Sequence, residues 1–145
     1  MAVLIDDLAL AKAYQKGLVF AALEDFSAVD VMGDIHGGQF GVSPDAWRNS
    51  VADFIYRNVA GGLLQIKSGL DIVPPEISPT ELHKLLLTTN PDDDTLLWMG
   101  LQFTATNDLV NLMRRIGLLD WNEYESELNN ELIASLEAIY LACPS

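Results

Sequence analysis

The chain has little of the material from which disulfide frameworks, metal centres and membrane spans are made. Its 145 residues include one cysteine and two histidines, and a lone cysteine cannot form an internal disulfide. The composition therefore gives no sign of an oxidising compartment. The apolar runs are short, and Leu18–Leu23 is far below the length that spans a bilayer. Because Asp6 and Asp7 stand where a secretory signal needs apolar residues, we expect a cytoplasmic protein that does not bind membranes.

Basic residues are much scarcer than acidic ones. Eight Lys and Arg stand against 21 Asp and Glu, a formal net charge of -13, although 50% of the residues are hydrophobic. A disordered acidic tail would lack the Trp, Phe, Leu and Ile that recur here at folding spacings, so the chain is predicted to fold with a strongly negative surface. Such a surface repels nucleic acid and attracts basic proteins by long-range electrostatics.

Helical periodicity and helix-start signals run through the chain and predict a mainly α fold. Its length suits a single domain, residues 1–145, that buries about two-thirds of its unfolded surface. The clearest helix starts are Ser43-Pro44-Asp45 and Ser78-Pro79-Thr80-Glu81, where Pro follows a capping Ser. We expect a bundle of about five to six helices. Their predicted ranges are about 6–26, 44–59, 79–88, 91–103, 108–116 and 121–142.

The segments between these helices are rich in glycine and proline. Residues 29–41 contain several glycines and are predicted to form a loop. Residues 63–67 are expected to be extended and to pair with residues 39–42 as a short two-stranded edge. Residues 68–78 hold two adjacent prolines and form the predicted connecting segment, because a residue before proline is disfavoured in a helix.

The last predicted helix has the clearest amphipathic pattern of the chain. Its apolar residues recur at steps of three and four, so we expect them to face the core. At least two of the three tryptophans are also predicted to be core residues, because each lies at an apolar helical position. The stripe of the last helix includes Trp121, Leu128, Leu132 and Leu136.

The sequence Gly33-Asp34-Ile35-His36-Gly37 is similar to the first block of the metallophosphoesterases, in which an Asp and a His two residues apart bind a metal. That resemblance implies phosphatase chemistry, which needs two metal ions and further Asp, Asn and His ligands. The later blocks are missing from this chain, and His83 is the only other histidine. We therefore expect no catalytic residue, no metal and no cofactor. His83 is predicted to be at the surface or half-buried, and Cys143 to be a small apolar residue that ends the last stripe.

The acidic residues gather in the second half of the chain. Residues 1–70 hold five bases and eight acids, whereas residues 71–145 hold three bases and thirteen acids. Three consecutive acids follow Asn90-Pro91, and three glutamates spaced four apart would share one face of the last helix. Like charges at that spacing cost about 0.2 to 0.5 kcal/mol per pair, a repulsion that a basic partner would relieve. The predicted partner-binding residues are Asp92, Asp93, Asp94, Glu123, Glu127 and Glu131.

A plainer interpretation of the same acids is a solvated face that keeps the protein soluble. The wider pattern favours a binding role. Ser43–Ile66 contains a capped helix followed by a Gly-Gly-Leu-Leu turn. Further apolar helical segments follow at Leu96–Trp98 and Trp121–Tyr140. This pattern in a small, acidic, mostly helical chain resembles the immunity proteins of bacterial contact-dependent inhibition and other polymorphic toxin systems. The resemblance implies a protein that binds and neutralises one cognate toxin domain, often a basic nuclease. It carries over no individual binding residue.

Three functional hypotheses follow from these observations. The first is an immunity protein that neutralises a basic toxin domain, since nucleases hold phosphate in a positive groove. The second is an acidic mimic of nucleic acid, or an adaptor, that inhibits a DNA-binding protein. The third is a small metallophosphoesterase. The first two differ in selectivity, because an immunity protein recognises one toxin domain whereas a mimic competes with DNA for its target.

Overall fold

The computed structural model describes residues 4–68, 70 and 73–143, and it is mainly helical with one small sheet, as the sequence predicts. Among the described residues the α-helices are α1 (Leu8–Leu23), α2 (Pro44–Ala60), α3 (Pro79–Leu87), α4 (Asn107–Arg115) and α5 (Asn130–Ala142). The shorter elements are the single turns η1 (Ala28–Asp30), η2 (Leu96–Gly100) and η3 (Trp121–Glu123), and the strands β1 (Leu64–Ser68) and β2 (Gln102–Ala105). No helix in these ranges has both the length and the apolar character needed to cross a bilayer.

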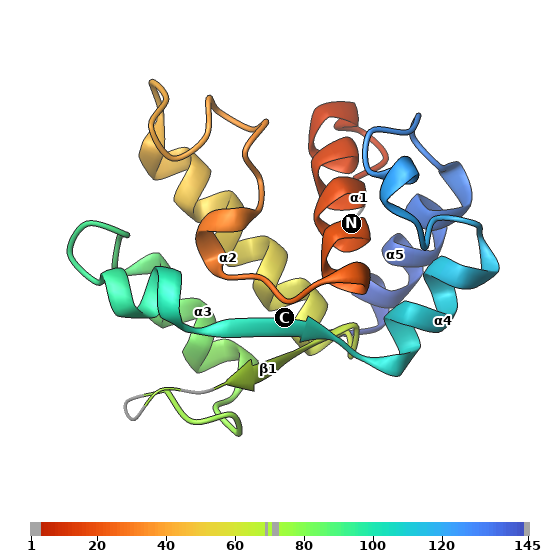
Figure 1. Ribbon diagram of the computed structural model, residues 1–145. Helices are drawn as coiled ribbons and strands as arrows, with labels where there is room; N and C mark the ends of the chain where they lie inside the picture. The colour runs from red at the N-terminus through yellow and green to blue at the C-terminus, as the bar shows by residue number, and fades with distance from the viewer. Residues whose placement is uncertain (1–3, 69, 71–72, 144–145) are drawn as a thin grey trace.

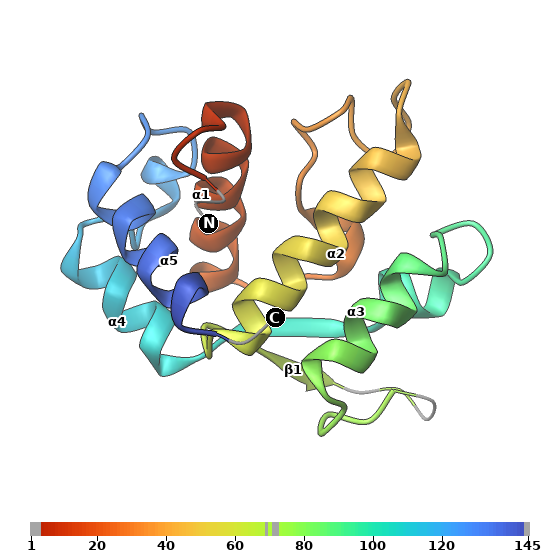
Figure 2. The same ribbon diagram turned by 180° about the vertical axis from the view of Figure 1, so that it is seen from behind.

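The helices form two groups that are joined by the sheet. Figures 1 and 2 show α2 beside α3 on one side and α1 beside α4 and α5 on the other, with the strands running beneath both groups. The groups meet where the ring of Phe54 on α2 packs edge-on against Tyr14 of α1, with centroids 5.0 Å apart. A Cβ on Gly17 would lie 2.8 Å from the Phe54 ring, so glycine at this position permits the close approach of the two helices.

The two clearest predicted helix starts, at Pro44 and Pro79, are confirmed in position. Ser78 accepts a hydrogen bond from the backbone N–H of Glu81 at 3.1 Å, which begins α3 as expected. Ser43 precedes α2 but makes no side-chain capping bond. Helix α4 begins at Asn107, one residue before its predicted range, because the Thr106 hydroxyl caps it by accepting from the backbone N–H of the third helical residue.

The two-stranded edge exists, but its predicted pairing is wrong. Strand β1 pairs antiparallel with β2, and residues 39–42 form no strand. The helix expected over 91–103 is also wrong at both ends, because residues 91–93 form a turn, η2 covers only Leu96–Gly100, and β2 follows. Burial explains both corrections. Phe103 is fully buried in the strand and stacks on Phe26 at 5.4 Å, whereas Phe40 is 90% exposed. The predicted connecting segment 68–78 lies partly outside the described residues.

The expected continuous helix over residues 121–142 is wrong, because the side chain of Gln15 holds part of that segment in another conformation. Gln15 lies on α1 and is 1% exposed. Its amide nitrogen donates to the backbone oxygen of Glu127 at 2.9 Å, and its amide oxygen accepts from the N–H of Asn129 at 2.8 Å. These backbone groups are thus engaged outside any helix. Helix α5 begins only after Asn129, whose side chain accepts from the N–H of Leu132 at 2.9 Å.

This break divides the predicted stripe and the predicted acidic face. Leu132 and Leu136 are fully buried, as expected, whereas Trp121 is 48% exposed and its predicted core position is wrong. Leu128 is partly buried against the core. The acids at 123, 127 and 131 lie in η3, in the segment held by Gln15 and in the first turn of α5. The expectation that they share one helix face is therefore wrong.

Two of the three tryptophans are core residues, as predicted. Trp47 and Trp98 are at most 1% exposed, and their rings lie 5.7 Å apart. The indole N–H of Trp47 donates to the backbone oxygen of Val31 at 3.3 Å, so its polar atom is satisfied inside the core.

Polar side chains at the C-terminal end of α2 link the two helix groups. The Arg57 guanidinium donates to the Tyr14 hydroxyl at 2.6 Å, and the Tyr140 hydroxyl of α5 donates to the Asn58 side-chain oxygen at 2.7 Å. Asn58 is fully buried, and its amide donates to the Phe54 backbone oxygen at 2.8 Å. Burial raises the pKa of Tyr14 to about 12, although the neighbouring Arg57 lowers it.

We expect Leu132→Ala to destabilise the fold by about 2 to 5 kcal/mol, because the side chain is fully buried and its loss leaves a cavity. Glu127→Ala is the matched control, since its side chain is exposed and should change stability little. Urea unfolding of both variants measures the difference. Equal midpoints would contradict the assigned position of α5.

We expect the wild-type protein to lose stability between pH 10 and pH 12. The pKa of Tyr14 is 10.0 in its ordinary state and about 12 in the fold, so the unfolded chain ionises first and the folded state loses stability, on the order of 3 kcal/mol, across this interval. Urea midpoints of the wild type and of Tyr14→Phe measure this loss. The variant, which lacks the phenol, should show a flatter dependence. Parallel curves for the two proteins would refute the role of Tyr14.

Candidate partner-binding cleft

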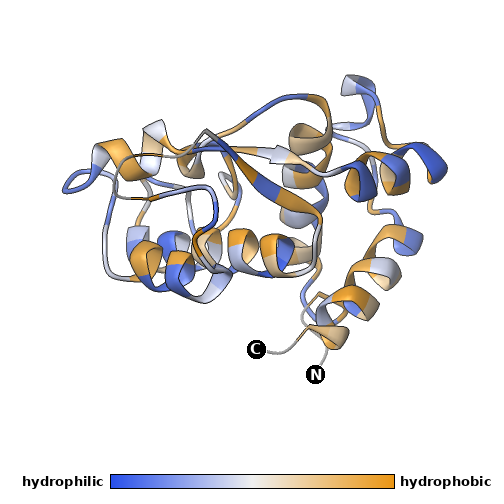
Figure 3. Cartoon of the chain, turned by 90° about the horizontal axis from the view of Figure 1, so that it is seen from below, coloured by the Kyte–Doolittle hydropathy of each residue, from blue (hydrophilic) through white to orange (hydrophobic). Residues whose placement is uncertain are grey.

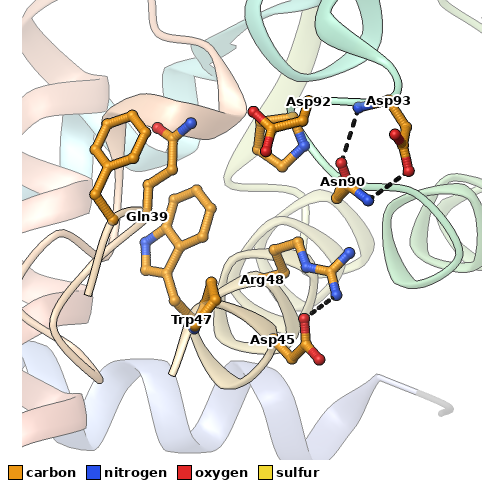
Figure 4. A pocket seen from close by; sticks show the side chains of 10 residues that line it. Gln39, Asp45, Trp47, Arg48, Asn90, Asp92 and Asp93 are labelled. Atoms are coloured by element: carbon orange, nitrogen blue, oxygen red, sulfur yellow. Dashed lines mark hydrogen bonds and ion pairs between the residues drawn. The ribbon is translucent and has the colours of Figure 1, made fainter. Parts of the chain in front are cut away.

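A cleft with a volume of about 250 Å³ opens between the start of α2 and the turn that follows α3. In Figure 4, Trp47 and Gln39 lie on one side of it, and Asn90 and Asp92 lie on the other. Its lining comes from two distant parts of the chain, and so only the folded protein forms it. The lining residues are Gln39, Phe40, Pro44, Asp45, Trp47, Arg48, Asn90, Pro91, Asp92 and Asp93.

Arg48 holds the two walls of the cleft in a fixed relation. It lies on α2, where its guanidinium pairs with the carboxylate of Asp45 one turn earlier. A second nitrogen of the same group donates to the backbone oxygen of Thr89, just before the opposite wall, at 2.9 Å. The indole N–H of Trp98 donates to the Thr89 hydroxyl at 3.0 Å and fixes that wall from within. The cleft therefore exists before any partner arrives.

The acidic wall is a turn that its own side chains stabilise. Asn90 accepts a hydrogen bond from the N–H of Asp93 at 2.8 Å and donates to the carboxylate of Asp93 at 2.7 Å. The cap-and-proline signal at this position thus makes a turn and starts no helix. Asp94 accepts from the N–H of Leu97 at 3.1 Å and begins η2. Asp92 is exposed, and its carboxylate pairs with no other group in the part of the chain that the structure describes.

The loop before α2 carries two highly exposed apolar side chains, and one of them, Phe40, lines the cleft. Phe40 is 90% exposed and Val42 is 97% exposed. The loop that carries them folds back on itself so tightly that only glycine fits at position 41. A Cβ there would lie 2.4 Å from the backbone oxygen of Gly37. Gly37 has a φ of 82°, a left-handed conformation that favours glycine. The glycines of this loop thus allow a tight bend that leaves Phe40 and Val42 exposed.

Negative charge and exposed apolar surface meet in this cleft. Its one cation, Arg48, is already paired with Asp45, so the free carboxylate of Asp92 and the partly engaged one of Asp93 leave the cleft negative. Exposed apolar side chains beside such charges are typical of a protein interaction site. The arrangement suits a partner that brings a Lys or Arg side chain and an apolar contact together.

The structure brings only part of the predicted site together. Asp92 and Asp93 line the cleft, and Asp94 follows them in the same turn but serves to begin η2. Sequence reasoning missed Phe40 and Val42, although two apolar residues among several glycines were a visible signal for an exposed loop. The remaining predicted residues, Glu123, Glu127 and Glu131, lie outside the cleft lining.

The residues of the phosphoesterase-like sequence have other partners. The Asp34 carboxylate accepts from the ammonium of Lys16 at 2.7 Å, and the same ammonium lies 3.1 Å from Glu125. His36 is exposed and has a φ of 56°. Within the described ranges, no three His, Cys, Asp or Glu side chains are placed to hold a metal ion.

His83 and Cys143 both take part in contacts between helices. His83 of α3 is half-buried as predicted, and its ring lies 2.8 Å from the carboxylate of Asp53 on α2. The thiol of Cys143 contacts the backbone oxygen of Ala60 at 3.5 Å, which joins the end of α5 to the end of α2.

Comparisons of the chain with protein-family models, with curated proteins and with solved structures find no match. Function is therefore inferred from the chemistry of the cleft and from the charge of the chain.

We expect Asp34→Ala and His36→Ala to leave the metal content of the purified protein unchanged, because Asp34 is paired with Lys16 and His36 is exposed on the loop. Metal analysis and turnover of a phosphate-ester substrate by the wild type and both variants measure this. Stoichiometric metal in the wild type that is lost in both variants would reverse the conclusion.

Proposed function

We propose that this protein is a cytoplasmic immunity protein that binds a cognate basic toxin domain and neutralises it. The observation that carries the proposal is the cleft, which is lined by both the unpaired carboxylate of Asp92 and the exposed side chain of Phe40. Strong protein interfaces combine an apolar or aromatic anchor with charges that match those of the partner. The loose resemblance to immunity proteins agrees with this chemistry.

The charge of the chain supports a basic partner in particular. With a formal net charge of -13, the protein attracts a positively charged domain over long distances and accelerates its association. Toxin domains that cleave nucleic acid need a positive groove for phosphate, and an acidic inhibitor matches such a groove. Rapid association suits an inhibitor that has to act before its target does damage.

The exposed rim favours the immunity hypothesis over the mimic of nucleic acid. A mimic matches the phosphate charges of DNA and needs no apolar contact at its binding surface. The exposed side chains of Phe40 and Val42 add apolar contacts to the charges. Such contacts can make binding selective for one protein surface. The cleft is also preformed, and a rigid site loses little conformational entropy when it binds a partner.

The test uses the basic toxin domain that the proposal expects in the reading frame next to this gene. Replacing Asp92 and Asp93 by Lys should slow association with that domain about tenfold at low salt and flatten its salt dependence. Phe40→Ala should act mainly on dissociation and raise its rate by about tenfold. Surface plasmon resonance measures both rates, and growth of toxin-expressing cells measures protection.

The matched control reverses two acids that lie in the lining of neither surface, namely Glu123 and Glu127. This variant carries the same charge change, so similar losses in both variants would mean that general charge, not the cleft, drives binding. Full affinity in both variants would place the docking surface elsewhere. Competition between this protein and DNA for many unrelated basic proteins would favour the mimic. An adjacent reading frame that encodes no toxin domain would count against the proposal.

A further inference from the structure

A second surface of the protein is apolar and lies apart from the cleft. A groove with a volume of about 250 Å³ runs between the N-terminal end of α1 and the start of α5. Leu4 and Ile133 are buried in its floor, whereas Ile5 and Leu8 at its edge are 58% and 70% exposed. Asn130 is the one polar residue in the described lining of this groove.

The outer side of α5 extends this apolar surface. Ala134 lines the groove, Ala138 follows one turn later, and Leu141 is 73% exposed. Residues spaced by four and three lie on one face of a helix, and these three positions span about 10 Å along its axis. In Figure 2 no other described helix or strand passes in front of α5, and Figure 3 shows this helix at the edge of the molecule. We call the groove and this stripe together the α1–α5 surface.

Carboxylates border the α1–α5 surface. Asp6 and Asp7 lie between its exposed residues Ile5 and Leu8, and Glu131 follows the lining residue Asn130. Asp7 also accepts from the N–H at the third residue of α1, while Asp6 and Glu131 are exposed. No Lys or Arg belongs to the described lining.

The nearest cation on α1 does not neutralise these acids. Lys12 follows Leu8 by one helical turn, and its ammonium donates to the backbone oxygen of Ser126. On the other side, Glu137 of α5 accepts from the backbone N–H of Leu4 at 2.9 Å, which fixes the chain at the floor of the groove. The surface is therefore apolar at its centre and negative at its edge.

This combination decides between the possible occupants. A second copy of the chain would bring Asp6, Asp7 and Glu131 of both molecules together, in a chain of formal net charge -13, and like charges would oppose the contact. An anionic membrane would be repelled for the same reason. An amphipathic helix with Lys or Arg on its polar side satisfies both features, because its apolar side enters the groove and its cations meet the carboxylates.

We propose that the α1–α5 surface is a docking site for a basic amphipathic helix of a partner protein. The residues that receive its apolar side are Ile5, Leu8, Ala134 and Leu141, and the acids that orient it are Asp6 and Glu131. This site goes beyond the proposed inhibition of a toxin, since it shares no lining residue with the cleft. Variants of either surface therefore test the two proposals separately.

The probe is a fluorescent helical peptide of about 18 Leu and Lys residues with one apolar face, together with a scrambled peptide of the same composition. Fluorescence anisotropy with the full chain should show binding of the amphipathic peptide about tenfold tighter than that of the scrambled one. Leu8→Glu should weaken binding of the amphipathic peptide about tenfold, because it places a charge in the apolar contact.

Leu96→Glu is the matched control, since Leu96 is 61% exposed and lies on η2. Both substitutions add one negative charge. Binding that depends on charge alone would therefore strengthen slightly in both variants, whereas docking in the groove weakens only for Leu8→Glu. Circular dichroism checks that each variant is folded, and Leu141→Glu tests the same surface if Leu8→Glu fails to fold.

Three outcomes would overturn the proposal. The first is equal affinity for the amphipathic and scrambled peptides, which would show that composition alone matters. The second is a concentration-dependent dimer in sedimentation experiments that Leu8→Glu abolishes, which would make a second copy the occupant. The third is binding of the wild type to phosphatidylserine vesicles that Leu8→Glu abolishes, which would make a membrane the occupant. Weaker peptide binding in Leu8→Glu alone, with a monomeric wild type that leaves vesicles unbound, is the expected result.

Discussion

The buried side-chain amide of Gln15 decides how the C-terminal part of the chain is arranged. Its nitrogen and oxygen bind the backbone of Glu127 and Asn129, so this segment runs along α1 outside any helix. The alternative would leave a buried amide without partners, at a cost of about 1 to 3 kcal/mol. Because α5 can start only after this segment, Gln15 also determines where α5 lies and which of its sides faces solvent.

Both candidate binding surfaces depend on a contact of this kind. With α5 packed through Leu132 and Leu136, its opposite side remains exposed and forms half of the α1–α5 surface. The cleft depends on a different tie, the Arg48 guanidinium, which reaches from α2 to the backbone of Thr89. Each surface is thus set by one polar side chain that binds the backbone of a segment distant in sequence. Such contacts give fixed geometry at sites where apolar packing alone is less directional.

The surroundings of each carboxylate decide whether its charge can contribute to binding a partner. Most carboxylates of this protein lie on the surface, where isolated charges contribute little to stability. Asp92 and Asp93 line a preformed cleft together with the exposed side chain of Phe40. Asp6 and Glu131 border an apolar groove in a comparable way. The long-range field of the chain can attract a basic partner to any face, and the apolar contacts then select where it binds.

Local signals in the chain are enough to predict the helical class, the starts of α2 and α3, and the sign of the surface charge, because caps, prolines and composition act locally or by simple addition. They did not indicate the turn at Asp92–Asp94, because the cap-and-proline signal of Asn90-Pro91 predicted a helix there. Tertiary structure decided the pairing of β1 with β2, the break before α5 and the joining of Phe40 to Asp92 across one cleft. Periodicity could not anticipate the break, since residues 121–142 satisfy a helical pattern until the distant Gln15 competes for their backbone. Contacts between residues far apart in the chain are absent from any local pattern, and such contacts form both surfaces of this protein.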